Sequence, residues 1–162
     1  INLQPDVVLS PSSGKVLEIQ KDVVDEFHGV EGTKIRIAIS WLNAFGLYLP
    51  ISGTIQNVEK FEGQKFYRLK SKLTFTNGFN RHNLTIKNSS ESVIYLELLN
   101  CPLGKTPRTW VEAGDKGRLA SNIGYFPLGG TVVITLPKDS EVFCKVGDHL
   151  RAGETVLSGL KG

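Results

Sequence analysis

Hydrophobic and polar residues alternate in short runs along this chain, and the runs predict strands rather than helices. Residues 34–40 alternate polar positions with apolar ones, which is typical of a strand with one buried face. Further strands are predicted where Val, Ile and Leu concentrate, in residues 7–9, 15–19, 54–58, 84–86, 93–99 and 154–157, and between Gly130 and Pro137. No segment shows the periodicity of an amphipathic helix. The pattern therefore predicts an all-β sandwich or barrel.

Polar segments separate these runs and predict the connections. Residues 20–33 are polar and contain two glycines, which predicts a loop or an irregular hairpin. Residues 75–83 are rich in Asn and Gly and predict a loop, and residues 88–92 predict a hairpin between two strands. Residues 65–73 are less regular and are compatible with a strand and its connection.

Two turn patterns each occur twice. Residues 10–16 and 49–55 share Pro-x-Ser-Gly, followed after one residue by Val or Ile. Proline presets the entry to a turn, and glycine adopts backbone conformations that other residues resist. Residues 111–115 and 145–149 share a Gly-Asp turn. This internal similarity indicates a barrel-sandwich hybrid built from two hammerhead halves, with residues 1–162 forming a single domain.

The composition limits the function classes that remain open. A net charge of +3 on 162 residues, without a block of like charges, is too small to argue for nucleic acid binding. Cys101 and Cys144 lack metal-ligand spacing and are predicted to be small buried hydrophobes, although a disulfide stays open. His28, His82 and His149 form no short-spaced cluster, and we expect them to be solvent-facing turn residues.

The start of the chain bears on its location. The chain contains no methionine and begins at Ile1, which indicates a processed or trimmed product. No apolar run is long enough to span a bilayer. We expect any signal peptide or membrane anchor to lie upstream of Ile1, so the compartment, and membrane association through such a segment, stay open.

Several motifs together resemble one known family. Residues 124–137 and 141–156 resemble the C-terminal end of phosphatidylserine decarboxylases, especially those of the short bacterial and archaeal type. Residues 10–16 resemble that family's Ser-Pro-x-x-Gly-Lys-Val turn, and residues 39–55 are similar to its central motif. The resemblance covers nearly the whole chain and keeps the order of the motifs.

This resemblance implies a proenzyme that cuts itself at a Gly-Ser bond within a Leu-Gly-Ser-Thr or Phe-Gly-Ser motif. The serine becomes an N-terminal pyruvoyl group, which is the electron sink for decarboxylation of phosphatidylserine. The matching residues here are Leu128, Gly129, Gly130 and Thr131, so a glycine stands at the serine position. Because glycine has no hydroxyl, neither the acyl shift nor the elimination can occur there. We therefore expect no pyruvoyl cofactor.

The central motif departs from the family as well. The family carries an Asp or Asn, a His two residues later, and a further basic residue or His before the proline. Aligned on Pro50, this chain has Asn43, Phe45 and Tyr48, and Phe45 cannot exchange a proton as a general base must. Arg81 replaces the glutamate of another family segment.

These losses predict a pseudoenzyme. We expect a non-catalytic module that binds a phospholipid headgroup, a membrane surface or a protein partner in the former cleft, without nucleic acid or metal; a homo-oligomer stays open. A persisting cleft is expected to be lined by Asn43, Phe45, Tyr48, Leu128, Gly129 and Gly130. Phe126, Trp41 and Trp110 are predicted to pack in the core near it.

Two alternatives stay open. The chain is an active decarboxylase if Gly130 is an engineered substitution, or if Thr131 attacks across the Gly130–Thr131 bond. It is a carrier or adaptor domain of a larger assembly if a lysine carries a covalent adduct. Lys15, the lysine nearest to a glycine corner, does not lie at the tip of a hairpin as such a carrier requires.

Overall fold

The computed structural model describes residues 7–25, 29–40, 45–61, 81–99, 106–127, 129–138 and 140–160. These residues form strands, turns and bends and no helix, so the all-β prediction is confirmed. Within the described ranges, no helical segment has the length and hydrophobicity that a membrane crossing requires. The strands are β1 (Val7–Leu9), β2 (Gly14–Asp25), β3 (Val30–Ile39), β4 (Gly46–Tyr48), β5 (Gly53–Phe61), β6 (Arg81–Lys87), β7 (Val93–Leu99), β8 (Arg108–Thr109), β9 (Lys116–Gly117), β10 (Asn122–Tyr125), β11 (Gly130–Pro137), β12 (Glu141–Val142), β13 (His149–Leu150) and β14 (Val156–Gly159).

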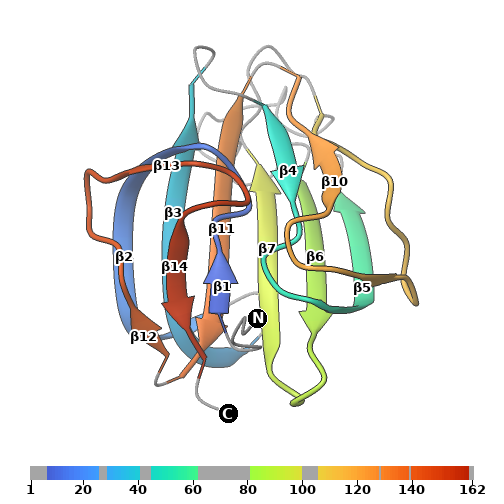
Figure 1. Ribbon diagram of the computed structural model, residues 1–162, viewed down its shortest axis with the longest axis horizontal. Helices are drawn as coiled ribbons and strands as arrows, with labels where there is room; N and C mark the ends of the chain where they lie inside the picture. The colour runs from blue at the N-terminus through green and yellow to red at the C-terminus, as the bar shows by residue number, and fades with distance from the viewer. Residues whose placement is uncertain are drawn as a thin grey trace, which may run out of the picture.

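The strands make two layers (Figure 1). The back layer is an eight-stranded sheet in the order β13-β2-β3-β11-β7-β6-β5-β9. The front layer consists of two three-stranded sheets, ordered β1-β14-β12 and β4-β10-β8. Apolar side chains of both layers form one core, because Val8, Leu47 and Leu157 of the front belong to the same buried cluster as Ile37 and Leu96 of the back. Each such side chain contributes about 1.5–3 kcal/mol through burial.

The eight-stranded sheet has an internal pseudo-symmetry, because the strands counted inward from one edge correspond to those counted inward from the other. Strands β13, β2, β3 and β11 correspond to β9, β5, β6 and β7, and the two small sheets correspond strand for strand. A register irregularity lies between Val16 and Glu18 of β2, and another lies between Ile55 and Asn57 of β5. The fold is therefore a pair of similar halves joined where β7 pairs with β11.

The repeated turns hold these halves together. The Leu9 amide donates to the Pro50 carbonyl at 3.0 Å, and the Tyr48 amide donates to the Pro11 carbonyl at 2.9 Å. These bonds are equivalent, because each turn binds the strand end that precedes the other turn. The internal repeat predicted from the turn motifs is thus present, while the barrel-sandwich hybrid class stays a prediction.

Each Gly-Asp turn closes one Pro-x-Ser-Gly turn in the same way. The Val16 amide donates to the Asp148 carbonyl at 2.9 Å, and the Ile55 amide donates to the Asp115 carbonyl at 2.8 Å. Both aspartates also accept a backbone hydrogen bond at the side chain, from Lys145 N at 2.9 Å and from Glu112 N at 2.8 Å respectively.

Of the two alternatives predicted for residues 20–33, the described residues confirm the irregular hairpin over the loop. Strand β2 continues to Asp25, β3 begins at Val30, and their antiparallel pairing is irregular between Gln20 and Val23. The polar side chains hide the length of β2 because most of the strand beyond Ile19 faces solvent while its backbone pairs with β3. Arg81, His82 and Asn83 belong to β6 rather than to a loop, whereas residues 62–80, including the predicted strand at 65–73, lie outside the described residues.

The equivalence of the two Gly-Asp turns gives a stability prediction. Asp115→Ala and Asp148→Ala each remove one carboxylate–amide hydrogen bond, and we expect each to lower the free energy of unfolding by about 1 kcal/mol. The double variant should lose about the sum, because the two sites share no partner. Chemical denaturation of the variants, with Asp→Asn controls that keep an acceptor oxygen, measures this. A strong departure from additivity would contradict the independence of the turns.

Candidate functional site

Two glycines begin the strand that carries the family motif. Gly129 has φ of 90°, and a Cβ there would lie 2.4 Å from the Ile39 carbonyl oxygen. Only glycine fits this close approach between the two backbones. Gly130 then enters β11, opposite Ile39 of β3. The strand predicted between Gly130 and Pro137 is confirmed and is largely buried, and the neighbouring Leu128 lies outside the described residues.

The space beside Gly130 is filled by an aromatic ring. A Cβ at Gly130 would lie 2.8 Å from Cδ1 and 2.9 Å from Cε1 of Phe126, and 3.1 Å from the carbonyl oxygen of Leu99. Phe126 is fully buried and belongs to the core cluster, as predicted. Any side chain at position 130 would require this ring to move.

Phe45, which directly precedes β4, lies next to Phe126. The Phe126 amide donates to the Phe45 carbonyl at 2.9 Å, and β10 pairs with β4 next to it, with Tyr125 opposite Gly46. The partly buried Phe45 side chain packs against the core. The structure therefore brings Phe45 to the segment that leads into Gly130. Asn43 lies outside the described residues.

Tyr48 lies on the other face of β4. Leu47 is fully buried, so alternation turns Gly46 and Tyr48 outward. A Cβ at Gly46 would lie 2.9 Å from Tyr48 Cε1, and a Cβ at Gly153 would lie 3.7 Å from its Cγ. The ring thus runs along the outer face of β4, while Phe126 packs on the inner side.

Thr131 is held by pairing on both sides. It lies opposite Ala38 of β3 and Leu99 of β7. Alternation along β11 directs its side chain away from the face on which Gly130 meets Phe126. The hydroxyl that a rescue reaction would use is therefore attached to a fully paired segment of strand.

His82 is not the solvent-facing turn residue that the sequence predicted. It lies in β6 with 4% of its surface exposed, and its Nδ1 is 3.5 Å from Oγ1 of Thr109. Burial, and then the positive charge of Lys60, lower the pKa of His82 from 6.5 to about 4. The imidazole is therefore neutral at physiological pH. No periodic signal marked this position, because the strand begins only one residue earlier.

The other candidate residues are dispersed. His149 is exposed, and His28 and Cys101 lie outside the described residues. Cys144 is a half-buried free thiol, and burial raises its pKa. The described ranges contain no group of acidic, His and Cys side chains that could hold a metal.

One shallow hollow of about 230 Å³ lies away from Gly130. It is formed by the first Gly-Asp turn and the neighbouring ends of β4, β5 and β10, and it includes Leu49, Asp115, Lys116 and Asn122. It is smaller than most small-molecule sites. The expected cleft around Gly130 stays a prediction, since Asn43 and Leu128 lie outside the described residues; among the described residues, Phe126 lies against Gly130.

The fold places the chain among the all-β proteins, and comparisons with known proteins identify its family. The chain belongs to the phosphatidylserine decarboxylase family, whose profile it matches over residues 1–158. It is 28% identical to a phosphatidylserine decarboxylase proenzyme of Desulfotalea psychrophila, over 94% of this chain and 71% of that protein. It is 23% identical to the proenzyme of Amoebophilus asiaticus, over 98% of this chain and 69% of that protein.

The buried histidine makes stability depend on pH. Because the pKa of His82 is lower in the folded chain than in the unfolded one, the unfolded chain binds the proton first as the pH falls. The stabilisation is complete above pH 6.5 and is lost toward pH 4, by up to about 1.4 kcal/mol per pH unit. We expect His82→Gln to remove this contribution from the unfolding free energy measured between these values. His149→Gln, at an exposed position, should keep the wild-type dependence; an unchanged profile in His82→Gln would contradict the assignment.

Proposed function

We propose that this chain is a non-catalytic member of the phosphatidylserine decarboxylase family that has kept the fold to bind phospholipid. The observation that carries the proposal is the packing of Phe126 against Gly130, where a Cβ would lie 2.8 Å from the ring. The position that must carry a hydroxyl in a self-cleaving chain has no side chain, and the core has closed over it.

Chemical requirements support this proposal. Self-cleavage needs an oxygen nucleophile on the residue after the scissile bond, and glycine has none. Proton transfer needs an ionisable or hydroxyl-bearing group, and Phe45 offers only a hydrocarbon ring. A pyruvoyl group does not fit the residues present, since it would have to arise from the side chain that Gly130 lacks.

The surroundings of Gly130 favour a natural loss over a single engineered substitution. In a chain built for serine, removal of the CH₂OH group would leave a space beside the glycine. Here Phe126 Cδ1 and Cε1 lie closer than a Cβ tolerates, and Phe126 is fully buried. Two positions therefore fit each other, which a single exchange would not produce.

The ligand proposal follows from the relatives. They are named as proenzymes that decarboxylate phosphatidylserine, so a phospholipid headgroup is the ligand class that a retained fold would bind. Binding to a protein partner instead is the alternative that the lipid experiments below distinguish.

Intact mass measurement tests the loss of self-processing. We expect purified protein to keep a single mass of 17.8 kDa after prolonged incubation, because Gly130, the residue directly after the family's scissile bond, carries no hydroxyl. Release of carbon dioxide from phosphatidylserine should equal that of a protein-free control. Two fragments that divide between residues 129 and 131, with a keto group at the new terminus, would overturn the proposal.

Gly130→Ser tests whether the core has closed. We expect this variant to stay uncleaved and to lose about 1–3 kcal/mol of unfolding free energy, because the new side chain displaces Phe126. The same exchange should cost less in a Phe126→Leu background, which provides room.

Gly159→Ser is the matched control, since a Cβ there would lie 3.6 Å from the ring of Phe143, an ordinary contact. We expect it to be nearly neutral. If Gly130→Ser is as neutral as this control, or cleaves itself, the packing argument fails.

A further inference from the structure

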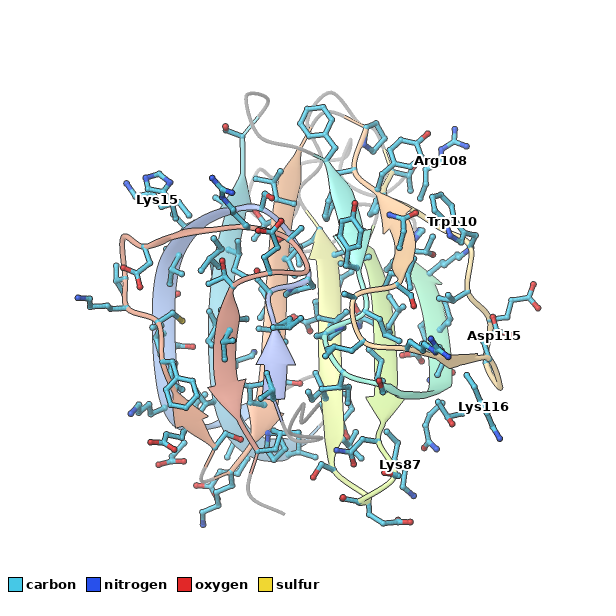
Figure 2. All side chains as sticks on the ribbon, viewed as in Figure 1. Lys15, Lys87, Arg108, Trp110, Asp115 and Lys116 are labelled. Atoms are coloured by element: carbon cyan, nitrogen blue, oxygen red, sulfur yellow. The ribbon has the colours of Figure 1, made fainter. Side chains whose placement is uncertain are left out.

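An exposed aromatic pair lies on the outer edge of the β4-β10-β8 sheet. Trp110, which was predicted to lie in the core, has 56% of its surface exposed, and Tyr125 has 38%. Figure 2 shows Trp110 and Arg108 on the same edge of the molecule, with both side chains directed outward. We call Lys60, Arg108, Trp110 and Tyr125 the aromatic–basic edge.

The two rings are held in place by the protein. Their centroids are 6.2 Å apart with an angle of 45° between the ring planes. The Trp110 Nε1 donates to the Asn122 carbonyl at 3.3 Å, so the polar atom of the indole already has a partner within the chain. What the indole presents to solvent is therefore mainly apolar surface.

Two cations accompany the rings. Arg108 lies opposite Tyr125 in the strand register, and its side chain is exposed. Lys60 is exposed as well, and it lies close enough to His82 to lower the pKa of that histidine. The Thr109 side chain reaches the same histidine, which places Lys60 near β8.

Neither cation forms a salt bridge with a described residue. Lys60 and Arg108 have no ion pair within the described ranges, whereas six other basic side chains pair with carboxylates at 2.7–3.9 Å. Along the chain, Glu59 directly precedes Lys60, and the acidic residues nearest to Arg108 are Glu112 and Asp115 of the following turn, where the Asp115 carboxylate binds a backbone amide. The edge therefore combines apolar rings with unpaired positive charge.

We propose that the aromatic–basic edge docks onto the surface of an anionic phospholipid membrane. Trp and Tyr rings are favourable at the boundary between headgroups and acyl chains, because one end of each ring is apolar and the other polar. Each cation near an anionic surface adds about 1 kcal/mol. The edge adjoins the family's former site, since Tyr125 is followed directly by Phe126, which packs on Gly130.

The choice of lipid rests on the proposed function, but the location of the surface does not. Trp, Tyr and Arg also dominate protein–protein hot spots. A membrane is favoured here because both basic groups lack partners and the rings contribute hydrocarbon without an unsatisfied N–H from the indole. A protein partner becomes the better explanation if the lipid test fails.

Vesicle co-sedimentation tests the proposal. The full chain is mixed with vesicles of phosphatidylcholine alone, or of phosphatidylcholine with phosphatidylserine or phosphatidylglycerol. We expect binding to both anionic mixtures that weakens as salt increases. Trp110→Ala should weaken binding about tenfold and Arg108→Gln about fivefold, which corresponds to roughly 1 kcal/mol for each lost contact.

Phe143→Ala is the matched control. Phe143 occupies the equivalent position in the other half of the fold, after β12, and is 54% exposed. Its removal should leave vesicle binding unchanged. In a Trp41→Phe background, the emission of Trp110 should shift to shorter wavelength when anionic vesicles are added, because the exposed ring leaves water.

The possible failures are distinguishable. Lack of binding to every vesicle overturns the inference, as does binding that survives in both Trp110→Ala and Arg108→Gln. In the second case lipid binding by another surface would still support the proposed function. Membrane docking through Trp110 in a chain that nevertheless cleaves itself would keep this inference and overturn the pseudoenzyme proposal.

Discussion

Pairing between β7 and β11 is the interaction on which the rest of the structure depends. It is the seam at which the two similar halves meet, with Val132 opposite Leu98 and Ile134 opposite Leu96. All four of these side chains are fully buried, so the seam joins the halves through the core as well as through backbone hydrogen bonds. The reciprocal bonds between the Pro-x-Ser-Gly turns close the front layer over it.

The halves differ at the ends of these two central strands, and the family site lies at one of them. Before β7 the chain makes a tight hairpin, in which the Asn88 side-chain oxygen accepts from the amides of Ser90 and Ser92 at 3.0 and 2.8 Å. Before β11 the chain arrives instead from β10 through Phe126 and passes Ile39 at Gly129. The two halves thus share a scaffold and differ in how the chain enters these two central strands.

Local patterns in the sequence determined much of this fold. Alternation predicted β3, and runs of apolar residues predicted β6 and β7 with the hairpin between them. The paired turn motifs predicted the internal repeat. Polar composition hid the length of β2, since the part of β2 beyond Ile19 pairs with β3 through its backbone while most of its side chains meet water. His82 and Trp110 were misplaced for a related reason: their burial is set by which strand covers them, and residues near them in sequence do not carry that information.

For the candidate site around Gly130, the sequence predicted which residues are present but not how they pack. The resemblance located Gly130 and Phe45, but the ring that fills the space beside the glycine came from Phe126, whose role no motif states. Replacing polar groups by an aromatic ring in a buried place removes the cost of desolvating them and adds apolar contacts. A former reaction centre can therefore become ordinary core without loss of stability. Once that has happened, the groups left to meet a ligand are those the core does not use, and the unpaired cations and exposed rings beside β8 are such groups.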